Sequence, residues 1–311
     1  MSSLSKPGKT AVLLLAHGSP DSVEDVPAFL LQVTGGRPLP PQVVEEVKHR
    51  YGLIGRSPLT ELTLKQGELL AHELGMPVYV GMRNWRPFIA DAVKAMSADG
   101  TAHAVVICLA PQNSRTSVGL YRSALGEGTL PFSIDFVESW HDHPMLINAF
   151  TEKLSAGWQR ACTEMGKKFP IIFTAHSVPQ RTIAEGDPYE SQAKETASLV
   201  ACEAGLAADD WKFAFQSQGM SGGTWLGPTV EETILALKEK GHAGVFLHPI
   251  GFLCDHVEVL YDIDIAFKQF AEKAGVRLWR AESLNDSQLL AQALADIARS
   301  RLVKTAAVST K

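Results

Sequence analysis

Two histidines and a pair of carboxylates stand where this sequence could do proton or metal chemistry. His17 ends the apolar run TAVLLLAHG, and His176 lies near the end of PIIFTAHS. Glu258 and Asp262 follow a third apolar run and are four residues apart, so on a helix they would share one face. Adjacent carboxylates repel unless a cation or a proton lies between them, and imidazole can take up a proton near neutral pH. These residues indicate a site that binds a divalent metal or moves protons.

Plainer interpretations of the same residues remain open. A single histidine at a strand end can be a capping or core residue, and acids in the first turn of a helix can simply favour its dipole. Asp255 and Glu258 fit that second interpretation, whereas Asp262 and Asp264 lie too far into the predicted helix. The apolar neighbours of these acids predict a largely buried helix, and a buried acid needs a partner, a metal or a proton.

Eight short apolar runs alternate with amphipathic stretches, which is typical of parallel sheets covered on both faces by helices. The predicted strands are TAVLLLAHG, MPVYVGM, HAVVICLAP, FSIDFVES, PIIFTAHS, KFAFQSQG, GVFLHPIGF and VRLWRAES. A long helix, HPMLINAFTEKLSAGWQRACTEMGKKF, is predicted to join the two groups of four. We therefore predict an α/β fold of two Rossmann-like domains, residues 1–160 and 161–311, each a parallel sheet flanked by helices. Ligands of such sheets bind at the carboxyl ends of the strands, where both histidines lie.

The composition excludes several classes of function. The chain has 311 residues, is 45% hydrophobic and 20% charged, and carries a net charge of -5, so no basic face for nucleic acid is expected. The longest apolar runs are shorter than the ~18 residues of a membrane span, and the first one reads as a strand rather than a signal peptide. We therefore expect a cytoplasmic protein. The four scattered cysteines form no CxxC pair, and the nucleotide-binding motifs GxGxxG and GxxxxGK(S/T) are absent.

Several segments, in this order, resemble the signature segments of ferrochelatases. They are AHGSP, RYGLIGRSPL, LAPQNSRTS, TAHSVP, FQSQG with WLGP, PIGFLCDHVEVLYDID and RAESLN, which together cover nearly the whole chain. The resemblance implies a lyase of haem biosynthesis that inserts ferrous iron into a porphyrin held in a cleft between the two domains. It implies porphyrin and Fe²⁺ as substrates, a monomer, and no prosthetic group. The last residues of the chain do not resemble the cysteine-rich tail that binds an iron–sulfur cluster in some relatives, so no such cluster is expected.

The resemblance also assigns roles to individual residues. His176 and Glu258 match the two residues that face the metal, so both are the expected catalytic residues. With Asp262 they are also the expected metal ligands. Removal of the pyrrole protons is assigned to His176, because a neutral imidazole is a suitable base near pH 7. Relay of metal or protons is assigned to Glu258 and Asp262.

Four further positions match residues near the porphyrin or its propionates in the family: His17, Arg50, Ser57 and Tyr121. An arginine suits a propionate because its planar fork donates two hydrogen bonds to a carboxylate. At position 17 the chain departs from the family, because some relatives have a tyrosine where this sequence has His17. An imidazole could ligate iron in its place.

The identity of the porphyrin rests on two segments that disagree. The predicted lip of the cleft, TGGRPLPPQVVEEVKHRYG, is short and polar, as in soluble bacterial relatives, many of which use coproporphyrin III. The segment RAESLN instead resembles the branch that uses protoporphyrin IX. We expect coproporphyrin III, with protoporphyrin IX as the alternative.

Two other functions remain as alternatives. One is a non-catalytic haem or porphyrin carrier, and the other is a chelatase of the cobalt or sirohydrochlorin type. The row of acids disfavours a carrier, which needs apolar walls and propionate clamps rather than a route for metal and protons. The WLGP and EVLYD segments disfavour the second alternative.

Overall fold

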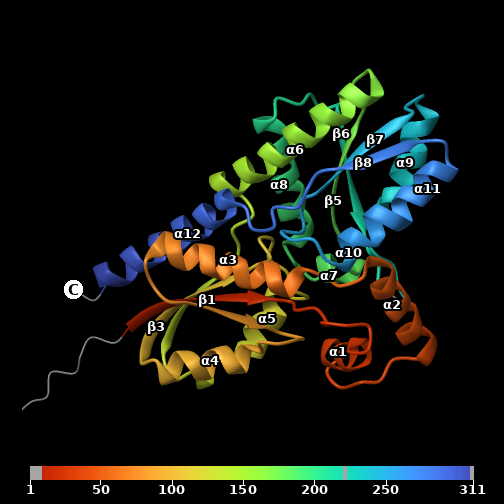
Figure 1. The fold of residues 1–311 in the computed structure, drawn as a ribbon. Helices are drawn as coiled ribbons and strands as arrows, with labels where there is room; N and C mark the ends of the chain where they lie inside the picture. Colours follow the sequence, from red (N-terminus) through yellow and green to blue (C-terminus); the bar gives the residue numbers. More distant parts are fainter. Residues whose placement is uncertain (1–8, 220–222, 309–311) are drawn as a thin grey trace, which may run out of the picture.

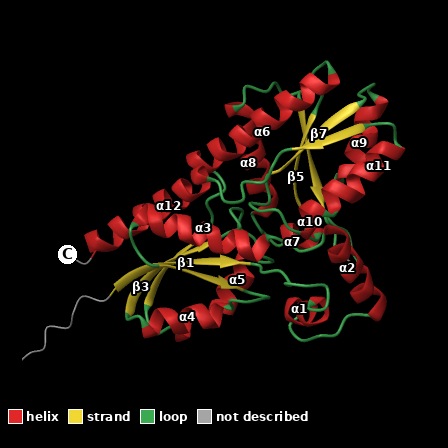
Figure 2. Cartoon of the chain, in the orientation of Figure 1, coloured by secondary structure: helices red, strands yellow, loops and turns green. Residues whose placement is uncertain are grey.

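Two four-stranded parallel sheets, each flanked by helices, form the protein (Figures 1 and 2). The computed structural model describes residues 9–219 and 223–308. The first sheet has the order β2-β1-β3-β4, with strands β1 (Lys9–Ala16), β2 (Val78–Met82), β3 (Thr101–Cys108) and β4 (Ser133–Val137). The second has the order β6-β5-β7-β8, with β5 (Ile171–His176), β6 (Trp211–Gln216), β7 (Gly244–Pro249) and β8 (Arg277–Arg280). All eight predicted strands and the predicted fold class are confirmed.

The helices lie between and around these strands. Those that precede the second sheet are α1 (Val26–Val33), α2 (Pro41–Ile54), α3 (Leu59–Leu74), α4 (Ile89–Ala98), α5 (Val118–Leu125) and the long α6 (Pro144–Met165). A short 3-10 turn, Glu127–Thr129, follows α5. The later helices are α7 (Gln180–Ala184), α8 (Tyr189–Glu203), α9 (Val230–Glu239), α10 (Val257–Leu260), α11 (Lys268–Lys273) and α12 (Gln288–Val308). None of the described helices is long and apolar enough to cross a membrane.

The last helix of the chain packs against helices of the first half. Helix α12 packs against α3 and α6, and Figure 1 shows it running beside α3 above the first sheet. One continuous hydrophobic cluster contains Leu14 and Ile107 of the first sheet, Phe173 of the second, and Leu294 of α12. The two sheets are thereby joined through a shared core. The predicted division at residue 160 falls within α6, and the assignment of two domains stays a prediction.

The strands are apolar along their length because both faces of each sheet are covered. In β1 every residue from Ala11 to Ala16 is buried. The parallel register pairs Ala16 with Met82 and His176 with Gln216, so neighbouring strands end at the same edge of each sheet. This register places the residues after β1, β2, β5 and β6 where a ligand of such a fold would bind.

The acidic segment after β7 is not the single α-helix that its pattern predicts. Helix α10 lasts one turn, and a π-helical turn, Asp262–Phe267, separates it from α11. The Tyr261 carbonyl accepts hydrogen bonds from the amides of Ile265, at 3.1 Å, and Ala266, at 2.9 Å, which marks the change from α- to π-type bonding. Glu258 and Asp262 therefore lie on either side of this change. Single π-turns within helices are rare and occur frequently at functional sites.

Candidate active site

The end of β5 faces the start of α10 through His176 and Glu258. The Nε2 atom of His176 lies 3.5 Å from Oε2 of Glu258. On the other side of the ring, Nδ1 is hydrogen-bonded to the carbonyl of Ser177. A carbonyl can only accept, so Nδ1 carries the hydrogen and the Nε2 lone pair of the neutral ring is directed toward Glu258. This tautomer leaves Nε2 free to take up a proton or to bind a metal.

Glu258 is a carboxylate with few partners. Its Oε2 atom is buried and makes no hydrogen bond to any part of the protein that the structure describes. The pKa of Tyr51 is raised to about 12, mainly by burial; a hydrogen bond with Ser19 opposes the rise, and the charge of Glu258 adds to it. Burial and then the same charge also raise the pKa of Tyr189. The charge of Glu258 therefore acts on several neighbours, while its Oε2 atom receives no hydrogen bond from the described residues.

Asp262 is the second acid of this site. Its carboxylate accepts a hydrogen bond from the Ser217 hydroxyl, and its Oδ1 lies 3.7 Å from Nη1 of Arg50. Burial raises the pKa of Asp262 to about 6, and the charge of Glu258 adds to the rise, while the Ser217 bond and the charges of Arg50 and His176 oppose it. An acid with such a pKa can exchange protons at physiological pH.

Two residues at the end of β6 support both acids. Gln216 is buried, accepts a hydrogen bond from Thr174 at 2.6 Å, and donates to the Glu258 carbonyl at 2.9 Å and to Ser217 at 3.3 Å. Ser217 adopts a positive φ of 58°, a conformation that non-glycine residues hold only where the surroundings impose it. These contacts aim Ser217 at Asp262. Neither residue was predicted from the sequence, although both lie within FQSQG.

The ends of β1 and β2 bring an imidazole and a cation to the same region. His17 packs edge-on against Phe29, with the ring centroids 5.9 Å apart, and its Nδ1 lies 3.0 Å from the Gly18 carbonyl. Burial and the charge of Arg83 lower the pKa of His17 to about 4, partly opposed by the charge of Glu258. The His17 ring is therefore neutral at pH 7 and lies within the electrostatic reach of Glu258.

Arg83 is a functional candidate that the sequence analysis missed. It directly follows β2, its guanidinium lies 5.5 Å from the ring centroid of Tyr121, and its Nε is buried without a hydrogen-bond partner in the described part of the chain. Burial lowers the pKa of Arg83, because removal from water disfavours the charged form of the guanidinium. Arg83 could have been found from its position, because it is a basic residue directly after a strand, at the edge that also carries His17.

The four predicted substrate-binding residues lie at different distances from the acids of the site. His17 and Arg50 lie beside the acids, and Arg50 also pairs with Glu46 at 2.9 Å and stacks on Tyr261 at 5.0 Å. Tyr121 is buried and is connected to the site through Arg83. Ser57 is buried just before α3, where its Oγ accepts a local hydrogen bond from the amide of Leu59 at 3.5 Å. Their roles toward a porphyrin stay predictions.

The predicted metal ligands form a facing pair with a neighbouring acid. Across residues 9–219 and 223–308, no group of three or more His, Cys, Asp or Glu side chains gathers as a metal-binding cluster. His176 and Glu258 lie opposite each other, and Asp262 senses both charges. The assignment of these three residues to a metal stays a prediction.

Solved structures of other proteins share this α/β fold. Among solved structures, SirB from Bacillus subtilis with Fe³⁺ superposes with a TM-score of 0.57 over 94% of both chains, at 12% identity. The cobalt complex of the sirohydrochlorin chelatase SirB from Bacillus subtilis subspecies spizizenii superposes with a TM-score of 0.52, at 10% identity. At such identities these likenesses show the fold alone.

The sequence comparisons identify the family. The ferrochelatase family model matches residues 9–302, and the chain belongs to the ferrochelatase family. It is 54% identical over 310 residues to a ferrochelatase of Acidobacterium capsulatum, covering 94% of this chain and 95% of the relative. It is 36% identical over 310 residues to a coproporphyrin III ferrochelatase of Geobacillus sp. strain WCH70, covering 94% and 98%. The family inferred from the signature segments is confirmed, and the carrier and sirohydrochlorin alternatives are not favoured.

Proposed function

We propose that this protein is an enzyme of haem biosynthesis that inserts Fe²⁺ into a porphyrin. The observation that carries the proposal is the pairing of His176 Nε2 with the hydrogen-bond-poor Oε2 of Glu258, 3.5 Å away, in a member of the ferrochelatase family. A base and an acid without a fixed partner are what the exchange of protons for a metal ion requires. We further propose that it acts as a cytoplasmic monomer without a prosthetic group.

The reaction replaces the two pyrrole N–H protons of the porphyrin by one Fe²⁺ ion, so each turnover releases both protons. The unprotonated Nε2 of His176 accepts the two pyrrole protons one after the other, and the Ser177 carbonyl holds the ring in the tautomer that can do so. Glu258 stabilises the imidazolium that forms and takes the proton onward. Asp262, with a pKa of about 6, passes it toward solvent. The same carboxylates attract Fe²⁺ on its way to the ring.

The substrate is held by the groups around this proton route. His17 is neutral at pH 7 because of its lowered pKa, so its ring can lie against the porphyrin or ligate iron without an added charge. Arg83 makes no ion pair with a carboxylate in the described part of the chain, so it is the cation we propose for a propionate. Arg50, Ser57 and Tyr121 complete the proposed binding set.

Coproporphyrin III is the substrate we propose, with protoporphyrin IX as the alternative. A cation such as Arg83 favours the porphyrin that carries more carboxylates. Among the relatives of this chain are coproporphyrin III ferrochelatases that are 34–36% identical to it.

The test is anaerobic Fe²⁺ insertion into coproporphyrin III and protoporphyrin IX, measured in parallel by absorbance. We expect a higher kcat/KM with coproporphyrin III. A preference for protoporphyrin IX would contradict the proposed substrate but would agree with the proposed reaction, Fe²⁺ insertion. Binding of both porphyrins without metallation of either would overturn the reaction and favour a carrier.

A further inference from the structure

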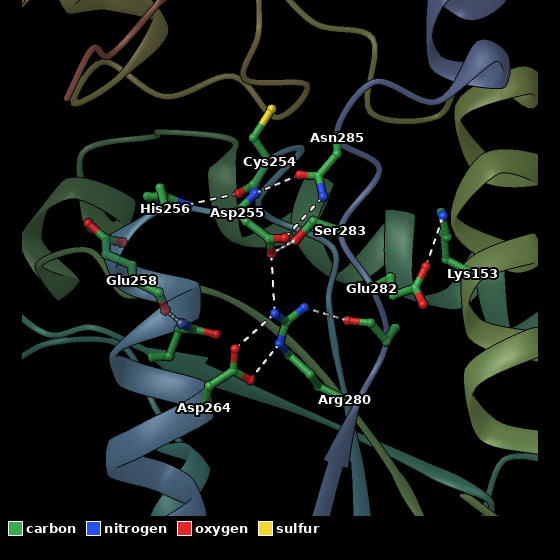
Figure 3. A network of polar contacts seen from close by, with 12 residues as sticks. Lys153, Cys254, Asp255, His256, Glu258, Asp264, Arg280, Glu282, Ser283 and Asn285 are labelled. Carbon is green, nitrogen blue, oxygen red and sulfur yellow. Dashed lines mark hydrogen bonds and ion pairs between the residues drawn. The ribbon is translucent and has the colours of Figure 1, made fainter. Parts of the chain in front are cut away.

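One cation, Arg280, holds both ends of the segment that carries Glu258 and Asp262 (Figure 3). Arg280 is the last residue of β8. Its Nε and Nη2 atoms donate to the two carboxylate oxygens of Asp264, at 2.7 and 2.9 Å, and Nη2 also lies 3.3 Å from Oδ1 of Asp255. Asp255 lies two residues before α10, and Asp264 lies within the π-turn. The two acids of the proton route stand between these contacts.

The Asp255 end of this arrangement is anchored to the loop between β8 and α12. The carboxylate of Asp255 accepts hydrogen bonds from Ser283 Oγ at 2.8 Å and Asn285 Nδ2 at 3.0 Å. Its amide donates to Asn285 Oδ1 at 2.8 Å, and Asn285 has a positive φ of 48°. The chain entering α10 is therefore held by side chain and backbone together.

The Asp264 end lies in a turn that needs support from outside. At Tyr261 two amides share one carbonyl, and π-type hydrogen bonding is less favourable than the regular α-helical pattern. The fork of Arg280 supplies that support, because a bidentate arginine–carboxylate pair is strong and directional. The Arg280 side chain is only 17% exposed, so solvent screens the contact little.

We propose that Arg280 is a positioning residue for iron insertion, which holds Glu258 and Asp262 opposite His176 by clamping Asp255 and Asp264 on either side of them. Within the described residues Arg280 forms no hydrogen bond or ion pair with Glu258, Asp262 or His176, so it acts through the backbone of α10 and the π-turn. The proposal rests on the proposed function. The 3.5 Å separation of His176 and Glu258 leaves little tolerance for a shift of α10.

The variants that test the clamp remove one of its parts at a time. Arg280→Met removes the whole clamp and also leaves two carboxylates without their cation. Asp264→Asn is the milder variant, because Arg280 keeps Asp255 and the Ala281 carbonyl. For both we expect kcat to fall by about tenfold or more while porphyrin affinity, measured by fluorescence quenching, is unchanged. Arg280→Lys should lie between wild type and Arg280→Met, because lysine keeps the charge without the fork.

Glu282→Gln is the matched control. Glu282 lies two residues beyond Arg280 and binds Lys153 at 3.2 Å and Arg160 at 3.1 Å on the surface. It alters an ion pair of similar chemistry outside the clamp, and we expect wild-type kcat. A folded Asp264→Asn or Arg280→Met protein with wild-type kcat would overturn the proposal. So would a parallel loss of kcat and porphyrin affinity, which indicates general damage to the binding region.

Amide hydrogen exchange gives a measurement that does not depend on turnover. The clamp predicts faster exchange over residues 257–267 in Asp264→Asn than in wild type, with no change in α9. Unchanged exchange in that segment would overturn the clamp even if the enzyme assay failed. Absence of metallation by the wild-type chain would instead refute the proposed function alone.

Discussion

Two pairs of carboxylates lie within ten residues of each other and differ in their hydrogen-bond and ion-pair partners. Asp255 and Asp264 share the guanidinium of Arg280, and Asp255 also receives two side-chain hydrogen bonds. Glu258 has a buried oxygen without a hydrogen bond in the described structure, and Asp262 has one hydroxyl donor and a guanidinium 3.7 Å away. The carboxylates of the first pair are held by a shared cation, whereas those of the second pair have few hydrogen-bond donors.

This difference separates the acids that hold the structure from the acids proposed to exchange protons. A fully paired carboxylate keeps its charge and its position, because protonating or moving it would break several hydrogen bonds. A buried carboxylate with few donors is destabilised as an anion, which is why burial raises the pKa of Asp262 to about 6. The four acids look alike in the sequence, and only their partners distinguish them.

The largest expected effect is on catalysis by His176→Ala. Removal of the proposed base should lower kcat by roughly 10²–10⁴-fold, with porphyrin binding retained. His141→Gln is the control, because His141 binds Glu195 at 2.9 Å and Ser139 at 2.7 Å outside the proton route, and its kcat should remain near wild type. Steady-state metallation and fluorescence quenching measure the two properties. Loss of folding in His176→Ala, without a selective loss of kcat, would identify a core histidine.

Asp262→Asn should change how stability depends on pH. The folded-state pKa of about 6 lies above the ordinary value of 3.8, so the anion is less stable in the folded protein than in the unfolded chain. At pH 7 this costs up to about 3 kcal/mol of unfolding free energy, and the cost disappears as the pH falls through 6 toward 4. The groups that face Asp262 are Glu258, Arg50, His176 and Ser217.

We therefore expect Asp262→Asn to be more stable than wild type at pH 7, with the difference shrinking toward pH 4. Urea unfolding at several pH values measures it. A constant difference across that range would show that Asp262 does not titrate as proposed and would remove the contrast between the two acid pairs.

Asp264→Asn should lower stability much more than Glu258→Gln. Asp264→Asn weakens a partly buried bidentate ion pair and should lower the unfolding free energy by about 1–3 kcal/mol. In Glu258→Gln the replaced carboxylate already has an oxygen without a hydrogen bond. This variant should change the unfolding free energy by less than about 0.5 kcal/mol. Urea unfolding at pH 7 compares them directly. Equal losses in both variants would mean that the two pairs are equally structural.

The smallest effect is expected from Arg50→Met. The charge of Arg50 lowers the pKa of Asp262, although less than burial raises it. Without that charge, the pH at which kcat falls on the acid side should move upward by no more than about one unit. A pH profile of kcat between 5 and 8 measures the shift, and Lys48→Met, which disrupts a surface pair with Glu45 on the same helix, is the control. A shift to lower pH would contradict the sign of the interaction.

Much of the fold follows from local pattern, because eight apolar runs flanked by amphipathic segments have few other arrangements. The position of His176 and Glu258 at this edge could be predicted for a similar reason, since a strand end and the start of a helix lie at the binding edge of such a fold. Their catalytic roles come from the family resemblance and stay predictions. The π-turn could not be predicted, because residue periodicity does not reveal where one extra residue enters a helix. The pairing of Asp264 with Arg280 was also hidden, since it joins residues from different elements. Arg83, Gln216 and Ser217 became visible only through their contacts.

The most direct test of the account is to measure kcat for Fe²⁺ insertion and the free energy of unfolding on one preparation of Glu258→Gln. The account predicts that kcat falls by about two orders of magnitude or more while stability is unchanged, because Glu258 serves the proton route and contributes little to the fold. Wild-type kcat, or a loss of stability as large as that of Asp264→Asn, would contradict it.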